Sequence, residues 1–368
     1  LMKFSLTAIL LLFTLFVSAQ EEKKEKAFIP NDVRTWKMTN MFTHADTIPI
    51  DTATNLHQVN DPLYHQSLGW VTTGNIGAPA KALYYPDVCR HQGNIFLTPL
   101  LPYIEQPEDY VFYNTKTPYA NFTYQKGFPK RRSEEYVHIL FTQNVNRKVN
   151  FGVKLAVRSS IGRYEAQRID HYDFRLHGSF NGEYYNGYGS VSYHKAKISE
   201  NGGIMDEALI SDPNPEEKDM YKKPEDLPVN MMNAVNKTSL YRIFYTHSLD
   251  LAHVERLDID STVYEVPVMT AFHTIHLETS HREFKMSSLP KDTSMLNEIF
   301  PNELEDGQKF PFYDKARTAD STRYFSLKNI FQLKMTEEFN SLLRFGVRAF
   351  LETEINLYTY PDFPQTTE

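Results

Sequence analysis

The sequence has little of what stabilises or anchors many secreted and membrane proteins. It contains one cysteine, Cys89, which excludes a disulfide framework and a zinc site built from cysteines. Beyond the N-terminus it has no run of about 20 apolar residues, which excludes a protein that crosses a membrane with helices. The mean hydropathy of −0.48 resembles that of a soluble chain. A membrane β-barrel is still compatible with this value, because only every second residue of its strands is apolar.

Signatures of catalysis are lacking too. The sequence contains no GxSxG nucleophile elbow, no HExxH helix and no phosphate-binding loop, so we expect neither an enzyme nor a bound cofactor. The densest group of histidines is His273, His276 and His281. On a strand, His273 and His276 would point to opposite faces and could not share a metal ion. The acidic stretch 199–237 is better explained as a solvated loop than as a cation site. We therefore expect no metal site, and no nucleic-acid partner.

What the sequence does contain is alternation of apolar and polar residues, which is clearest in KVNFGVKLAVRSSIG, residues 148–162. Successive side chains of a strand point to opposite faces, and about 9–11 residues suffice for a tilted strand to cross a bilayer. The apolar face carries Val149, Phe151, Val153, Leu155 and Val157. We predict a transmembrane strand with these odd-numbered residues facing lipid and the even-numbered ones facing the lumen. Shifting the register by one would turn Lys154 and Arg158 to the lipid, at about 2–4 kcal/mol each.

The chain ahead of the strands divides into two parts. Residues 1–19 combine a basic Lys3, an apolar core and a small-residue cleavage motif, which predicts a signal peptide cleaved after Ala19. Residues 20–108 are irregular and rich in proline, which argues against a stack of central strands. This segment could lie in the periplasm, plug a barrel or add an early strand, and the sequence does not choose between them. Within it, GWVTTGNIGAP and NIFLTPLL are candidate short strands.

Repeated alternation predicts an all-β fold over residues 109–368, namely a partial antiparallel transmembrane β-barrel. Nine membrane-length strands are expected, at 116–126, 135–145, 148–162, 169–182, 184–196, 238–249, 267–281, 323–336 and 338–352. Tight turns are expected near 146, 182 and 337, and long polar loops at 199–237 and 285–322. If the turn within residues 250–266 lies at the same end of the strands as the short turns, short turns and long loops alternate along the chain, as in bacterial outer-membrane barrels.

Several stretches are similar to one known family. TPYANFTYQKG, EEYVHILFTQNVNRKVNFGVKLAVRSSIGRY and HGSFNGEYYNGYGSVSYHKAKISENGGI, with GNIGAP near Gly74, resemble the putative porin family of Bacteroidetes-type outer membranes. The resemblance implies a β-barrel in the outer membrane of a Gram-negative bacterium, surrounded by outer-membrane lipid and inserted by the barrel-assembly machinery. The odd strand number, and an end at PQTTE without a terminal aromatic, lead us to expect a C-terminally truncated member.

Two classes of function stay open. The favoured one is a porin for passive diffusion of small hydrophilic solutes. The alternative is an outer-membrane barrel that is not an open pore, acting as an adhesin, a surface structural protein or an export-complex subunit. A secreted β-sandwich is disfavoured, because sandwich strands rarely sustain ten residues with one wholly apolar face. Homo-oligomerisation is left open.

Strand parity also predicts which charged side chains line the lumen. The basic residues expected there are Lys154, Arg158, Arg175, Arg242, Lys328, Lys334, Arg344 and Arg348. The inward acids are fewer: Asp173, Glu278 and Glu352. Basic residues in a pore lower the barrier for anions, whereas the same residues near strand ends would meet lipid headgroups. We therefore predict a mild anion preference.

Overall fold

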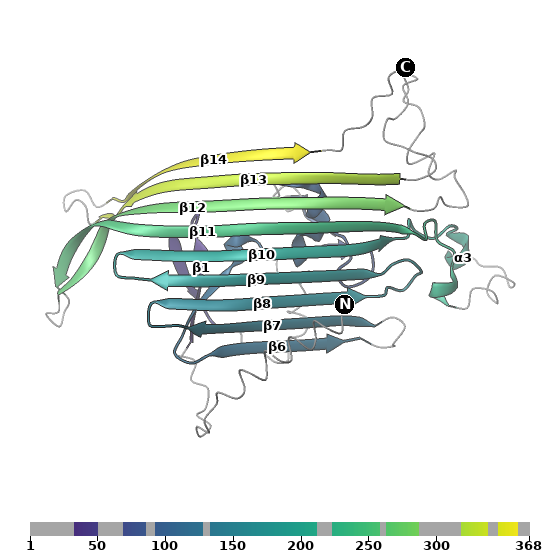
Figure 1. Cartoon of the computed structure of the whole chain (residues 1–368), viewed down its shortest axis with the longest axis horizontal. Coiled ribbons are helices and arrows are strands. Elements are labelled where there is room, and N and C mark those ends of the chain that lie inside the picture. The colour runs from purple at the N-terminus through teal and green to yellow at the C-terminus, as the bar shows by residue number, and fades with distance from the viewer. Residues whose placement is uncertain are drawn as a thin grey trace, which may run out of the picture.

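The computed structural model describes residues 33–50, 69–85, 93–127, 133–211, 223–257, 263–286, 318–337 and 345–359. Its main feature is an antiparallel sheet in which each strand pairs with its neighbours in sequence (Figure 1). The strands are β6 (Tyr119–Lys126), β7 (Glu134–Asn144), β8 (Val149–Ser160), β9 (Ile169–Asn181), β10 (Tyr185–Glu200), β11 (Ala234–Leu257), β12 (Val263–Met286), β13 (Thr318–Met335) and β14 (Val347–Thr359). The all-β antiparallel class and the nine strands of this sheet are confirmed, and β6 and β14 are its edges in the described part of the chain. The predicted signal peptide lies outside the described residues.

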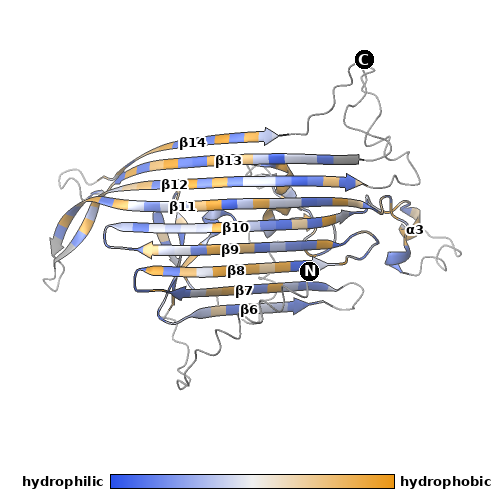
Figure 2. Cartoon of the chain, in the orientation of Figure 1, coloured by the Kyte–Doolittle hydropathy of each residue, from blue (hydrophilic) through white to orange (hydrophobic). Residues whose placement is uncertain are grey.

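The two faces of this sheet differ in the way that the alternation predicts, and Figure 2 shows the alternation along the strands. On β9, His171, Arg175 and His177 are buried, whereas Phe174 and Leu176 between them are 42% and 44% exposed. The same division holds on β8, β10 and β11. Large apolar side chains exposed on the outer face include Phe151, Tyr172, Val191, Tyr241, Ile243, Phe331 and Leu333. An apolar surface spread over so many adjacent strands is typical of contact with lipid or with another protein.

The N-terminal part of the chain covers the other, inner face of the sheet. It contains β1 (Val33–Thr39), β2 (His44–Ile48), β3 (Trp70–Thr72), β4 (Ala80–Ala82), η3 (Ile95–Tyr103), η4 (Pro107–Asp109) and β5 (Val111–Thr115). In Figure 1 these elements lie behind the large sheet. Strands β1, β2 and β5 form a small antiparallel sheet of their own, and β3 pairs with β4. The described part of this segment therefore packs on the inner face of the large sheet, and its role as a plug stays a prediction.

Apolar contacts attach the N-terminal segment to the inner face. One cluster packs Trp36, Phe42 and Phe112 against Tyr188 and Phe244 of the large sheet. A second cluster joins residues of η3 and the β3–β4 region to the sheet, and it includes Ala78, Leu97, Leu100, Ile169, Ala196 and Leu240. The rings of Phe42 and Phe244 have their centroids 4.8 Å apart. The N-terminal segment and the sheet therefore share their hydrophobic core.

One expected short strand in this segment is wrong. The stretch NIFLTPLL forms the 3₁₀ helix η3, whose first turn is capped by Asn94: its side chain accepts a hydrogen bond from the Phe96 amide at 3.0 Å. Pro99 and Pro102 lie inside this helix. Because proline has no amide hydrogen, it cannot donate to a strand ladder, and a short 3₁₀ segment tolerates it better. The other candidate, GWVTTGNIGAP, does supply β3 and the start of β4.

The connections follow the expected alternation of short turns and long loops. Strands β11 and β12 are 24 residues each, and their pairing extends to Leu257 and Val263, so this hairpin turns on the same side as those near 146 and 182. A break in register near Asp250 marks where the hairpin extends past its neighbours. On the opposite side, the connection from β10 to β11 contains α3 (Ala208–Ser211) and η6 (Pro224–Asp226). No helix in the described residues has the length and hydrophobicity that crossing a membrane requires.

The expected last strand is wrong in its bounds, and so is the tight turn near 337. Strand β14 spans Val347–Thr359, and Met335 pairs with Val347, so residues 336–346 separate β13 from β14. Residues 347–359 continue the odd-apolar alternation that starts at Phe339. A shift by an even number of residues keeps every side chain on its face, so the alternation alone could not locate the strand.

Candidate functional site

The basic residues of three inner-face strands converge on one short piece of the N-terminal segment. Lys154 of β8 and Arg175 of β9 are direct partners in the antiparallel register. Two cations directly opposite one another would repel, which destabilises a strand pair. Glu105, between η3 and η4, lies against both: its Oε2 is 2.6 Å from Nζ of Lys154, and its Oε1 is 3.0 Å from Nη1 of Arg175. One carboxylate from outside the large sheet thus compensates a like-charge pair within it.

The electrostatics of Glu105 show the strength of this arrangement. Burial alone would raise the pKa of its carboxyl group, because the charged form loses hydration. The positive charges of Arg175 and Lys154, and their hydrogen bonds, outweigh burial and lower the pKa to about 2. Glu105 is therefore ionised at every physiological pH. The ion pairs bind the N-terminal segment to the wall of the sheet as long as the carboxylate carries its charge.

A second buried ion pair lies next to Glu105. Arg242 of β11 pairs in register with Glu278 of β12, and the guanidinium donates to Oε2 of Glu278 from Nε at 3.0 Å and from Nη2 at 2.7 Å. Both side chains are almost completely buried, at 2% and 7% exposed. Arg242 also donates from Nη1 to the backbone oxygen of Glu105 at 2.9 Å, and from Nη2 to Oε1 of Gln106 at 3.3 Å. Its donors therefore serve both the sheet and the N-terminal segment.

Aromatic rings hold the remaining buried arginine. The guanidinium of Arg158 lies 5.0 Å from the ring centroid of Tyr136 and 5.8 Å from that of Tyr103. Arg175 has a ring partner as well as its carboxylate, because its guanidinium lies 4.6 Å from the centroid of Tyr110. Cation–π contacts of this kind are worth about 2 kcal/mol or more when both partners are desolvated. Tyr103 and Tyr110 belong to the N-terminal segment, so these contacts also attach it to the sheet.

The structure brings together only part of the predicted lumen set. Lys154, Arg158, Arg175 and Arg242 lie on the inner face beneath the N-terminal segment. Lys328 lies apart from them and pairs with Glu352 across β13 and β14 at 2.6 Å. Arg348 donates to the backbone oxygen of Asn40 at 3.1 Å, Lys334 is half-buried on β13, and Arg344 lies outside the described residues. Whether these side chains line an open pore stays a prediction.

The predicted lipid-facing row occupies the opposite face of β8. Val149, Phe151, Val153, Leu155 and Val157 are exposed or half-buried, whereas Asn150, Gly152, Ala156 and Arg158 between them are buried. Contact of this row with lipid remains a prediction.

Sequence reasoning missed the acid that completes the site. Glu105 is one of three acids, with Glu108 and Asp109, in the stretch LPYIEQPEDY, where no periodicity identifies a face. The available signal was the imbalance itself, because the inward residues predicted from parity contain many more bases than acids. Buried charges require partners, so the excess of bases calls for an acid from elsewhere in the chain. That signal predicts a partner and does not say which acid it is.

The buried histidines of the described part of the chain form no metal centre. His171, His177 and His194 are buried on the inner face. His273 lies 3.2 Å from His247 on the outer face, while His276 lies on the inner face, 3.9 Å from Glu278. This agrees with the opposite orientation expected for His273 and His276. In the described ranges, no three His, Cys, Asp or Glu side chains are arranged to hold a metal ion.

These features define the class of the protein. Eight of the nine strands have 11 or more residues, the outer face is apolar, and the inner face carries buried charges under an N-terminal segment. This combination is typical of the wall of an outer-membrane β-barrel that holds a plug, although the described sheet is open at β6 and β14.

The chain belongs to a porin family. The family model described as "Putative porin" matches residues 32–367, which confirms the resemblance found in the sequence. Membership implies an outer-membrane location in Gram-negative bacteria, and it is typical of channels rather than enzymes. The matched range includes the N-terminal segment as well as the strands. Comparisons with curated proteins and with solved structures found no match.

Proposed function

We propose that the chain forms the wall of an outer-membrane barrel that lets small hydrophilic solutes diffuse across the membrane. The observation that carries the proposal is the division of the sheet into an apolar outer face and a charged inner face over strands long enough to cross a bilayer. Family membership supports it. The N-terminal segment occupies part of the inner face and would narrow the lumen beside it.

One observation favours the alternative, a barrel that is not an open pore. The N-terminal segment is attached to the sheet by two apolar clusters as well as by ion pairs, and residues such as Leu97, Phe112 and Phe244 are fully buried between them. Separating the N-terminal segment from the sheet would expose this core to water, which requires a large free energy. A barrel kept closed by this segment would suit an adhesin, a surface structural protein or an export-complex subunit.

Conductance of the purified full-length protein in planar bilayers separates the two functions. A diffusion channel gives stepwise, ohmic conductance at KCl concentrations where detergent alone gives none. Protein that is inserted and folded, as shown by the shift of its gel mobility on heating, but that does not conduct would contradict the proposal and favour the closed barrel.

The same recordings test the expected mild anion preference. Glu105 is one carboxylate for two cations, and the rings around Arg158 leave its charge in place, so the inner face keeps a positive excess. We expect a reversal potential of the anion-selective sign under a KCl gradient, and an anion-to-cation permeability ratio reduced by about twofold or more in Arg344→Glu plus Arg348→Glu. Arg147→Glu, in an exposed turn, is the control. Cation preference in the wild type, or no change in the double variant, would contradict this prediction.

A further inference from the structure

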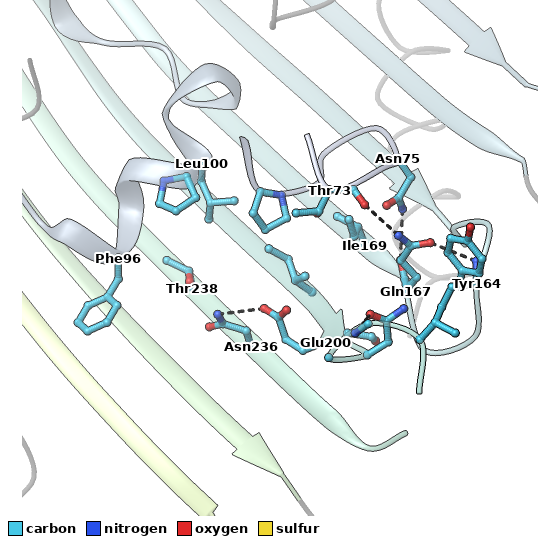
Figure 3. Close-up of a pocket in the computed structure, with 18 residues that line it drawn as sticks. Thr73, Asn75, Phe96, Leu100, Tyr164, Gln167, Ile169, Glu200, Asn236 and Thr238 are labelled. Atoms are coloured by element: carbon cyan, nitrogen blue, oxygen red, sulfur yellow. Dashed lines mark hydrogen bonds between the residues drawn. The ribbon is translucent and has the colours of Figure 1, made fainter. Parts of the chain in front are cut away.

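The outer face of the large sheet is basic at its long-loop end. On the inner side of this end, Asn236 and Thr238 of β11 line a cavity of about 600 Å³ (Figure 3). Because successive side chains of a strand point to opposite faces, Lys237 between them lies on the outer face. The same alternation places Lys195 and Lys197 of β10 there, next to Lys237 in the antiparallel register. All three lysines are exposed.

The neighbouring strands extend this row of cations. Arg168 lies at the start of β9, Lys285 near the end of β12 and Arg323 on β13, and the alternation places each of them on the outer face. All three are exposed. We call these six residues the basic band: Arg168, Lys195, Lys197, Lys237, Lys285 and Arg323.

Two acids of the outer face lie within the basic band, and each of them lies beside two bases. Asp170 accepts from Nε and Nη2 of Arg168 at 3.0 and 3.2 Å, and it is opposite Lys197 in the register. Glu283 forms an ion pair with Lys237 at 3.3 Å and another with the second lysine after it on β12. The two carboxylates therefore compensate only part of the positive charge.

Lys195 and Arg323 have no acidic partner. Within the described part of the chain, neither side chain forms an ion pair or a hydrogen bond. Their register neighbours on the outer face carry no negative charge: Tyr172 and Ser239 beside Lys195, and His281 and Thr359 beside Arg323. The basic band thus keeps a positive excess, although the whole chain has a net charge of −7.

The basic band lies at the height where lipid headgroups are expected. Lys195 follows Tyr185 of the short-turn end by ten residues on β10, which is about 33 Å along a strand. At a strand tilt of about 40°, typical of membrane barrels, this becomes about 25 Å across the membrane, the height of their apolar band. The rows between carry exposed apolar side chains such as Val191 and Ile243. The cations therefore border the apolar surface directly.

We propose that the basic band binds the phosphate groups of anionic lipids in the membrane leaflet on the long-loop side. Lipid phosphate supplies the negative charge that Asp170 and Glu283 do not provide. The long stems of Lys and Arg can lie along apolar surface while their charges reach the headgroups. A neutral lipid or an apolar protein surface would leave Lys195 and Arg323 without an anion. This inference rests on the proposed function, because it takes the outer face to contact lipid, and it adds a lipid class to it.

The test is selective quenching of a fluorescent probe by brominated lipids, with the full-length protein folded into vesicles. The probe is attached at Ser239→Cys, beside Lys195 in the register, in a Cys89→Ser background. The vesicles mix phosphatidylcholine with phosphatidic acid, and either one or the other lipid carries the bromine. We expect the anionic lipid to be favoured about fivefold at position 239. At Leu249→Cys, on the outer face at the short-turn end, we expect about equal affinity for the two lipids.

Lys195→Gln plus Arg323→Gln should lower the preference at position 239 to about twofold, because about half of the positive excess is lost. Arg147→Gln plus Lys148→Gln is the matched control, since it removes the same two kinds of charge from an exposed turn at the opposite end of the sheet. It should leave the preference unchanged. Inorganic phosphate at constant ionic strength should leave it unchanged as well. Heat-dependent gel mobility shows that each variant is folded.

Several results would overturn the inference. These are equal affinity for the two lipids at position 239, an equal preference for the anionic lipid at position 249, and a loss in the control variant as large as in the Lys195 and Arg323 variant. Loss of the preference with inorganic phosphate would assign the basic band to free phosphate instead of lipid. Quenching without preference contradicts the lipid class alone. No quenching by either lipid would mean that protein covers this face, which also contradicts the proposed function.

Discussion

Replacing Arg242 by Met is expected to lower the free energy of unfolding by about 3–5 kcal/mol, the typical cost of removing one member of a buried ion pair. Glu278 is 7% exposed on its side chain, and both of its short hydrogen bonds in the pair come from Arg242. The variant also removes the donor to the backbone oxygen of Glu105. It therefore weakens the β11–β12 pair and the attachment of the N-terminal segment together.

The double variant Arg242→Met plus Glu278→Leu tests whether the unpaired charge is the cause. Replacing a buried ion pair by apolar residues of similar volume is often neutral or stabilising, so most of the loss should be recovered. The measurement is the urea midpoint of the folded fraction in lipid vesicles, followed by gel mobility without heating. A single variant as stable as the wild type would contradict the prediction, because it would show that the buried Glu278 carboxylate does not depend on Arg242.

Replacing Glu105 by Gln is expected to cost about 3 kcal/mol at pH 7. The pKa of Glu105 is about 2, against an ordinary value of 4.5, and each unit corresponds to about 1.4 kcal/mol. Because the pKa is lower in the folded state, this stabilisation is complete above the ordinary pKa and is lost as the pH falls toward about 2. The stability difference between wild type and Glu105→Gln should therefore be constant near neutral pH and shrink below about pH 4.5.

Asp109→Asn is the matched control for Glu105→Gln, because Asp109 is an acid of the same segment in a more exposed pair. Its Oδ1 lies 3.1 Å from Nζ of Lys37, with side chains 46% and 33% exposed. Exposed pairs contribute about 0–1 kcal/mol, so this variant should change the urea midpoint little. Equal losses in the two variants, or a Glu105→Gln effect that does not depend on pH, would mean that Lys154 and Arg175 are stabilised by something other than the Glu105 carboxylate.

Most of what could be predicted about the large sheet came from the alternation of apolar and polar residues. On β8 and β9 the apolar rows of Val153 and Leu176 define one face, and the hairpin signal at Asn181-Gly182 defines where the chain turns, so bounds and faces could both be predicted. On β14 the faces could be predicted and the bounds could not. The alternation continues over residues 338–359, and moving the bounds of the strand by two residues leaves every side chain on the same face.

The N-terminal segment could not be predicted in the same way, because it has no periodic face. Its position depends on contacts between residues far apart in sequence, such as Glu105 with Lys154 or Gln332 with the backbone oxygen of Met41. The turn that contains Met41 is unusual too, since Asn40, Met41 and Phe42 all have positive φ. Such strained turns persist only where surrounding contacts hold them, and these contacts come from the large sheet. A single sequence therefore revealed the charge imbalance on the inner face but not the segment that compensates it.

The proposed function requires that the outer face of the sheet contacts lipid while the inner face does not. It can be tested by fluorescence of a probe attached to single cysteines at Val153 and at Lys154, in a Cys89→Ser background, with vesicles that contain brominated lipid as quencher. The two residues are adjacent on β8 but lie on opposite faces. A transmembrane wall predicts strong quenching at 153 and weak quenching at 154. Equal quenching at both positions, or none at either, would contradict it.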